Sequence, residues 1–192
     1  MHKKIIIMCL LLVAFQGCAF VNVPLFQFTQ PLVEKNLEGK GKNKILLIDI
    51  EGVITSGKKQ SFLGSDTEPD PVARIKEELE KASLDKRIKA VILKINSPGG
   101  TVTASAIIHK ELLKFKEKTG IAVIACLMDI AASGGYYVAN AADKIIAHPT
   151  TVTGSIGVIA MKFNVKGLMD KIGVSDETIK SADKKDILSP FR

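Results

Sequence analysis

Cysteine and aromatic residues are scarce in this chain of 192 residues, which contains three cysteines, two tyrosines and no tryptophan. Cys9 lies within an apolar N-terminal run and Cys18 closely follows that run, so Cys126 is the one cysteine in the body of the chain. A lone cysteine can form neither a disulfide within the domain nor a cysteine cluster for a metal. In the apolar run 121–127, we expect it to pack as a small apolar side chain.

A one-sided charge distribution is also absent. The formal net charge is +7, but basic residues are mixed with acidic ones, as they are in residues 76–81. Such mixing is typical of solvated helix faces and differs from the basic, aromatic-interleaved stripe of a nucleic-acid-binding protein. We therefore expect no nucleic-acid partner.

Apolar runs long enough to cross a bilayer are missing, and the longest begins near the N-terminus. Basic residues 2–4 precede the apolar run 5–15, which is short for a membrane span but suits a signal segment. Gly17 and Cys18 end it, and a small residue before cysteine resembles the lipobox of bacterial lipoproteins, which implies lipidation of Cys18. An ordinary cleaved signal and an uncleaved anchor remain alternatives. All three predict a domain outside the cytoplasm.

Composition divides the rest of the chain. Residues 1–18 form the expected signal or lipoprotein segment, 19–43 a tether that ends rich in Gly and Lys, and 44–192 one domain. Apolar patterns within that domain predict strands over 45–50, 88–95, 121–127, 144–147 and 156–161, and helices over 70–82, 104–118, 133–142 and 168–172. Alternating strands and helices indicate an α/β fold with a mostly parallel sheet covered by helices.

Ser133 is the candidate nucleophile. It lies among small residues in the segment 130–137 (Ile-Ala-Ala-Ser-Gly-Gly-Tyr-Tyr), where a strand is expected to give way to a helix. A hydroxyl there is exposed, and the amides that follow it can donate to an oxyanion. A helix N-cap would use the same backbone position, so this alternative stays open.

A second glycine motif, residues 96–100 (Asn-Ser-Pro-Gly-Gly), follows another predicted strand. It could be a plain tight turn. Because the carboxyl ends of parallel strands carry the chemistry of such sheets, it could also supply a backbone amide to the same site. Gly100 and Gly134 are the candidate donors.

Lys185 is the candidate general base, in a cluster with Lys180 and Lys184. Taken alone, it reads as one surface lysine among several. A lysine that acts as a base must be neutral, which requires removal from water or nearby positive charge. His109, expected on a solvated helix face, and His148, at the end of a strand, are weaker candidates for the base.

Four segments together resemble signal peptide peptidase A, in its short bacterial form. They are 96–100, 131–137, 153–158 (Thr-Gly-Ser-Ile-Gly-Val) and 180–186 (Lys-Ser-Ala-Asp-Lys-Lys-Asp), and their order and spacing agree with that family. The resemblance runs from about residue 44 to residue 192. It implies the ClpP/crotonase-like fold of repeated ββα units, which the proteolytic subunit of Clp protease shares.

The resemblance also implies an activity. The implied protein is a membrane-associated serine endopeptidase that degrades residual signal peptides. The resemblance makes Ser133 the nucleophile, Lys185 the base and Ser155 the residue that orients the lysine. It assigns Gly100 and Gly134 to the oxyanion hole. No metal or organic cofactor is needed. The expected partners are signal peptides and other apolar peptides, the membrane, and further copies of the chain that complete shared active sites. The family continues beyond the lysine motif, whereas this sequence stops at Arg192.

Three alternatives remain open from the sequence. The first is a Ser/His peptidase of the ClpP type, which needs a histidine beside Ser133. The second is a non-catalytic lipoprotein or inactive fragment that acts as an interaction module. The third, a crotonase-type acyl-CoA enzyme, is remote because that chemistry does not call for a helix-start serine and a distant lysine.

Overall fold

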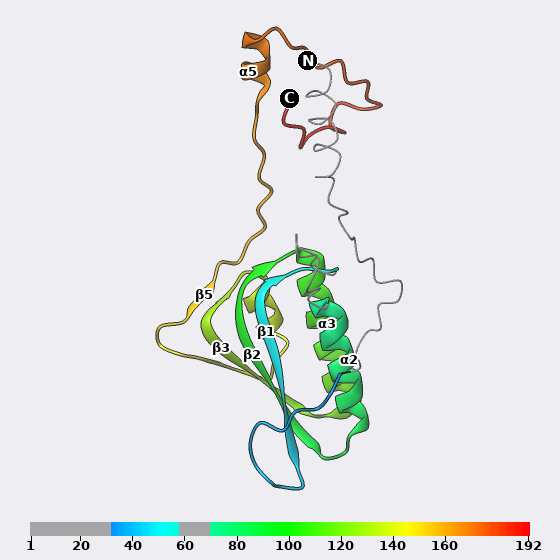
Figure 1. Cartoon of the computed structure of the whole chain (residues 1–192), viewed down its shortest axis with the longest axis vertical. Coiled ribbons are helices and arrows are strands. Elements are labelled where there is room, and N and C mark those ends of the chain that lie inside the picture. Colours follow the sequence, from blue (N-terminus) through cyan, green and yellow to red (C-terminus); the bar gives the residue numbers. More distant parts are fainter. Residues whose placement is uncertain (1–31, 58–69) are drawn as a thin grey trace, which may run out of the picture. The chain divides into compact units, whose positions relative to one another are not determined.

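The computed structural model describes residues 32–57 and 70–192 (Figure 1). Contacts divide the chain into Met1–Glu38 and Gly39–Arg192. The described part of the first unit, 32–38, has no regular secondary structure. The predicted signal segment, with Cys18, and the first part of the predicted tether lie outside the described residues.

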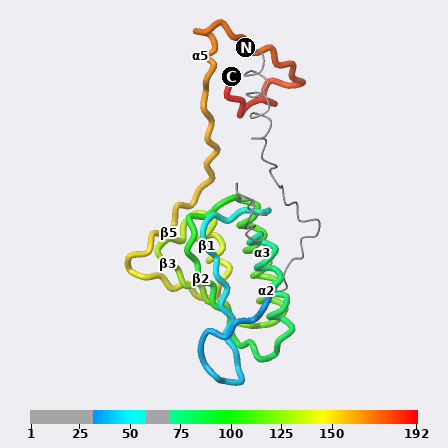
Figure 2. The backbone as a smooth tube through the Cα atoms, in the orientation of Figure 1, coloured from blue at the N-terminus to red at the C-terminus, as the bar shows by residue number. Residues whose placement is uncertain are grey.

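The second unit is built from alternating strands and helices, as Figure 2 traces along the chain. Its elements are β1 (Lys44–Ile54), α2 (Pro71–Leu84), β2 (Ile88–Gly100), α3 (Val102–Thr119), β3 (Ala122–Ala132), α4 (Gly134–Ala139), β4 (Lys144–Ala147), β5 (Val152–Gly154) and α5 (Lys166–Lys171). The sheet order is β1-β2-β3-β4, with β5 also paired to β3, and each of these pairings is parallel. The predicted α/β fold with a mostly parallel sheet is confirmed.

Local sequence signals place the long helices. Asp70 caps α2, because its Oδ1 accepts a hydrogen bond from the Val72 N–H at 2.9 Å, and Pro71 opens the helix without an N–H to satisfy. Thr101 caps α3 in the same way, and Gly120 ends it in the left-handed conformation. The predicted helices over 70–82 and 104–118 are therefore confirmed.

The hydrophobic core lies between the sheet and its helices. Alternate residues of β1, β2 and β3 point into it, while α2, α3 and α4 contribute their apolar faces to the same cluster. In Figure 1, α2 and α3 lie side by side against the sheet. The core residues of the three strands are Ile48, Ile50, Ile54, Val91, Leu93, Ile95, Val123, Ala125, Leu127 and Ala131.

The fifth strand lies earlier than predicted. The sequence pattern predicted a strand over 156–161, but β5 covers Val152–Gly154 and residues 156–161 are irregular, with Ile156 85% exposed. Gly154 and Ser155 both have positive φ, +83° and 52°. These two residues break the extended conformation, so the chain leaves the sheet before the apolar run begins.

Two other predicted elements differ in length. The predicted helix over 133–142 is shorter, because α4 ends at Ala139. The segment 96–100 is not a tight turn. It continues β2, with Gly99 and Gly100 paired to the end of β1.

Asp143 joins the end of α4 to the sheet, which makes it a test of this part of the fold. Its Oδ2 accepts from the Val123 N–H at 2.8 Å, and its Oδ1 lies 2.7 Å from Lys116 Nζ. Lys116 first, and then the Val123 amide, hold the pKa of Asp143 below its usual value. Because the side chain is 46% exposed, we expect Asp143→Ala to reduce the free energy of unfolding at pH 7 by only about 1 kcal/mol.

The pH dependence gives this prediction its sign. A carboxyl with a lowered folded-state pKa stabilises the protein above its ordinary pKa, and this stabilisation is lost as the pH falls toward the lowered value. Urea unfolding should therefore give a lower free energy of unfolding for Asp143→Ala than for the parent at pH 7, and similar values for both proteins in acid. Asp170→Ala, which removes an exposed helical ion pair with Lys166, is the control. If the difference in free energy of unfolding between parent and Asp143→Ala were as large in acid as at pH 7, the ionised Asp143 carboxylate would not be the source of the stabilisation.

Candidate active site

Ser133 occupies a strained turn between β3 and α4. Its φ of 51° and ψ of −119° are unusual for a residue with a side chain. It stands at the N-cap position of α4, but its side chain makes no capping hydrogen bond. A serine on a sharp strand-to-helix turn presents its hydroxyl at the carboxyl end of the sheet, which is the arrangement that a nucleophile requires. Ser133 is half-buried, and its hydroxyl is not used as a cap.

Hydrogen bonds with β5 hold this turn. The Ser133 N–H donates to the Gly154 carbonyl at 2.8 Å, and the Thr153 hydroxyl donates to the Ala131 carbonyl at 2.8 Å. Ser155, the predicted lysine-orienting residue, directly follows Gly154 and is exposed. The fold therefore brings the backbone of Ser155 next to Ser133.

The glycines at the end of β2 pack against the same turn. A Cβ placed on Gly99 would lie 2.6 Å from the Gly134 nitrogen and 2.9 Å from Ser133 Cβ. Gly99 also has a φ of +96°, which side chains rarely adopt. The sequence pattern pointed to Gly100 and Gly134 and did not single out Gly99, although a side chain on Gly99 would collide with the Ser133 turn.

The two predicted oxyanion donors lie close together. The Thr101 N–H donates to the Ile54 carbonyl of β1 at 2.8 Å. A Cβ on Gly134 would lie 3.2 Å from the Gly100 nitrogen. Gly134 is the first residue of α4, where N–H groups lack partners within the helix.

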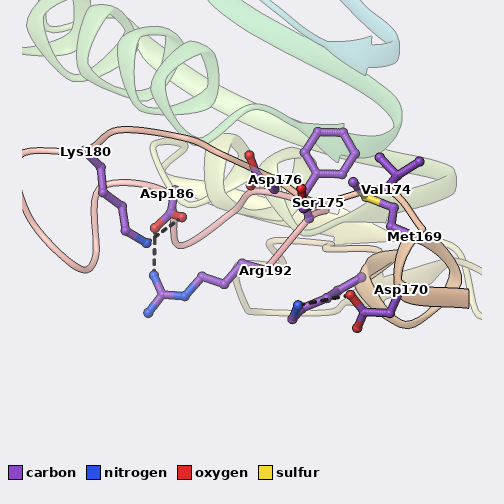
Figure 3. Close-up of a pocket in the computed structure, with 10 residues that line it drawn as sticks. Met169, Asp170, Val174, Ser175, Asp176, Lys180, Asp186 and Arg192 are labelled. Atoms are coloured by element: carbon purple, nitrogen blue, oxygen red, sulfur yellow. Dashed lines mark hydrogen bonds and ion pairs between the residues drawn. The ribbon is translucent and has the colours of Figure 1, made fainter. Parts of the chain in front are cut away.

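Lys185 lies in the C-terminal segment of the chain, in a series of turns. It is exposed, and its backbone N–H donates to the Ala182 carbonyl at 3.2 Å. Neighbouring Asp186 binds Lys180 and Arg192, each at 2.9 Å (Figure 3). The Lys180 hydrogen bond is the main cause of the lowered pKa of Asp186.

These contacts distinguish the lysines of the cluster. The Lys180 amine is held by Asp186, whereas the side chains of Lys184 and Lys185 have no hydrogen-bond or ion-pair partner within residues 32–57 and 70–192. The same segment lines a pocket of about 410 Å³, to which Lys180, Asp186 and Arg192 contribute (Figure 3). In the described chain, no hydrogen bond joins Lys185 to Ser133 or to Ser155.

Among the residues that the structure describes, neither candidate histidine bonds to Ser133. His148 follows Ala147, which pairs with Leu127, so it stands well before Ser133 along β3, and its Nδ1 lies 2.8 Å from the Thr150 hydroxyl. The His109 ring stacks on Tyr137 with centroids 4.6 Å apart. This geometry gives no support to a Ser/His arrangement within one chain.

Among the described residues, no helix is both long and apolar enough to cross a membrane. Cys126 is a free, half-buried cysteine of β3.

A parallel sheet covered by helices, with a serine on a strained strand-to-helix turn and glycines beside it, defines an α/β protein of the ClpP-like fold class that carries a candidate nucleophile. Residues 50–153 match the Clp protease family model, and residues 115–192 match the model of Peptidase family S49. The Clp protease model covers more than half of the chain, including most of the sheet and the Ser133 turn, so the chain belongs to that family, and its C-terminal part is similar to Peptidase family S49.

Individual relatives carry the names of peptidases. The chain is 40% identical over 167 residues to a signal peptide peptidase SppA of Enterococcus faecium, which covers 86% of this chain and 48% of the relative. It is 41% identical over 142 residues to Protease 4 of Haemophilus influenzae, covering 73% of this chain and 22% of the relative. The chain therefore spans about half the length, or less, of these relatives.

The fold has a counterpart among solved structures. A membrane-bound stomatin-specific protease superposes with a TM-score of 0.50 and 23% identity, over 65% of this chain and 53% of that one. This likeness concerns the fold alone.

Proposed function

We propose that the protein is a membrane-associated serine endopeptidase that degrades residual signal peptides with a Ser133/Lys185 dyad. The observation that carries this proposal is the Ser133 turn, whose hydroxyl is not used as a cap and which packs against the glycines of β2. The relatives named signal peptide peptidase and Protease 4 support the substrate class.

Each residue of the site has a role in the proposed reaction. Lys185 takes the proton of the Ser133 hydroxyl as its oxygen attacks the peptide carbonyl, and the Gly100 and Gly134 amides stabilise the negative charge on the carbonyl oxygen. The lysine then returns the proton to the leaving amine, and water hydrolyses the acyl-enzyme. The Ser155 hydroxyl orients the lysine amine. The reaction needs no metal or organic cofactor.

The dyad is proposed to form between neighbouring copies of the chain. Lys185 is exposed, yet a lysine base must be shielded from water to be neutral when it acts. Contact with a second copy would provide that shielding and bring the amine to a Ser133 hydroxyl. The proposed assembly is a homo-oligomer, tethered through lipid on Cys18 to a bacterial membrane, with its domains outside the cytoplasm.

Mixing inactive variants tests this arrangement. We expect Ser133→Ala and Lys185→Ala proteins to be inactive alone, and to recover up to roughly a quarter of parental peptidase activity when they are unfolded and refolded together, since random mixing pairs the two intact residues at that frequency. A fluorophosphonate probe should label only the chains that retain Ser133. Recovery of no activity by the mixture, with the parent active, would place both residues of the dyad in one chain.

The two remaining alternatives predict different results for peptide hydrolysis and probe labelling. A parent that hydrolyses no peptide and takes no probe, although folded, would favour the non-catalytic interaction module. Probe labelling that is lost in His148→Ala but kept in Lys185→Ala would favour the Ser/His peptidase.

A further inference from the structure

The sheet is irregular at the point where β2 reaches the candidate active site. The pairing of β2 with β1 shifts register between Glu51 and Val53 of β1. The pairing of β2 with β3 shifts register between Ile95 and Ser97 of β2. A register shift interrupts the ladder and leaves backbone groups without their regular partners. Two consecutive polar side chains, Asn96 and Ser97, stand at this double irregularity.

Both side chains replace missing ladder bonds. Asn96 Oδ1 accepts from the Ile130 N–H of β3 at 3.2 Å. On the other side, the Ser97 hydroxyl donates to the Gly52 carbonyl of β1 at 2.6 Å and accepts from the Gly99 N–H at 3.0 Å. Ser97 is 0% exposed, so water cannot substitute for either bond.

The bond from Gly99 to Ser97 lies directly beside the candidate active site, because Gly99 packs against Ser133 and Gly134. It occupies the Gly99 N–H and holds the peptide in the positive-φ conformation. The next amide, that of Gly100, lies close to Gly134, since a Cβ on Gly134 would be 3.2 Å from the Gly100 nitrogen, and the Ile54 carbonyl of β1 beside it is bonded by Thr101. Anchoring to the Gly52 carbonyl fixes this arrangement to the neighbouring strand.

We infer that Ser97 is a positioning residue of the oxyanion hole, whose buried hydroxyl sets the direction of the Gly100 N–H. The inference rests on the proposed peptidase function. Ser97 touches neither the substrate nor the reacting atoms, so its removal should weaken stabilisation of the oxyanion and leave binding of the uncharged substrate nearly unchanged.

Ser97→Ala in the intact protein is the test. With a fluorogenic apolar peptide, we expect kcat to fall about tenfold to a hundredfold while KM changes less than about twofold, because an oxyanion donor acts only in the transition state. A leucine-rich peptide aldehyde, which adds to the Ser133 oxygen and places its own oxygen in the hole, should lose affinity by a similar factor. The matching peptide alcohol, which cannot form that adduct, should bind as before.

Thr119 offers a matched control. Its hydroxyl donates to the Phe115 carbonyl at 2.7 Å and accepts from the Ile121 N–H at 3.2 Å. Like the Ser97 hydroxyl, it therefore donates to one backbone carbonyl and accepts from the amide two residues later in the chain. It lies near the amino end of β3, remote from the catalytic turn. Thr119→Ala should therefore lower thermal stability and leave kcat and aldehyde affinity at parental values.

The outcomes separate this inference from the proposed function. Equal kcat in Ser97→Ala and Thr119→Ala, or equal losses of aldehyde and alcohol affinity in Ser97→Ala, would overturn the positioning role while Ser133 remained the nucleophile. Peptidase activity that survives Ser133→Ala would overturn the proposed function, and the positioning role with it. If Ser97→Ala does not fold, Ser97→Thr and Ser97→Val replace it, because threonine and valine have nearly the same shape and only threonine has a hydroxyl. The inference is overturned if the threonine variant binds the aldehyde no more tightly than the valine variant.

Discussion

Ser133→Ala is expected to abolish peptidase activity, with a fall in kcat of at least about a thousandfold and no loss of folding. The Ser133 hydroxyl makes no capping hydrogen bond, so its removal takes nothing from the stability of α4. Lys185→Ala should lower kcat by about 10²–10⁴-fold, the range attributed to general acid–base catalysis. Both values come from steady-state hydrolysis of an apolar peptide, with thermal melting as the check on folding.

Neighbouring residues provide the controls for this pair. Lys184→Ala removes an adjacent exposed lysine and should retain activity, and His148→Ala should also retain it. Full activity in Lys185→Ala would remove the lysine from the mechanism. If Lys184→Ala lost activity while Lys185→Ala kept it, Lys184 would be the base, and the alignment of the motif 180–186 with the family would be wrong by one residue.

Gly99→Ala is expected to have the second largest effect, on stability and activity together. The added Cβ would lie 2.6 Å from the Gly134 nitrogen, 2.9 Å from the Ala132 carbonyl oxygen and 2.9 Å from Ser133 Cβ. Two of these neighbours are backbone atoms, which cannot move without displacing the nucleophile turn. Together with the positive φ, this crowding should cost about 3 kcal/mol or more in the free energy of unfolding.

Two other glycines separate backbone strain from crowding. Gly120 has a φ of +65° with nothing within 4 Å of an added Cβ, so Gly120→Ala should cost only about 1 kcal/mol. Gly157 has open space and no positive φ, so Gly157→Ala should be nearly neutral. Urea unfolding and peptide hydrolysis measured on all three variants would test this order. If Gly99→Ala were no more damaging than Gly120→Ala, the close packing of the two glycine segments would be disproved.

The predictable parts of the fold depend on neighbours in sequence. The Asp70–Pro71 start of α2, and the spacing of Ile75, Leu79 and Ala82, report on hydrogen bonds and side-chain faces within one helix. The strand patterns over 45–50 and 88–95 likewise report burial of short apolar segments. These signals sufficed to predict a parallel sheet and to place both glycine motifs at the carboxyl ends of strands.

The ends of the strands could not be predicted in this way. Residues 96–100 look like a turn, yet they continue β2 because β1 offers them backbone partners. Residues 156–161 have a strand-like composition, but the positive φ values at Gly154 and Ser155 turn the chain away from the sheet. Pairing partners and local turns, which are set by the rest of the fold, override β-propensity in both places.

The sequence alone determined the candidate nucleophile, because a serine between small residues at a strand-to-helix junction is a local pattern. It left the cap and the nucleophile as alternatives at Ser133. The tertiary structure argues against the side-chain cap, since the Gly154 carbonyl and the close approach of Gly99 hold Ser133 in a conformation in which its hydroxyl makes no capping hydrogen bond. The role of nucleophile stays a prediction. The role of Ser97 was likewise invisible in the sequence, because its partner Gly52 comes from another strand.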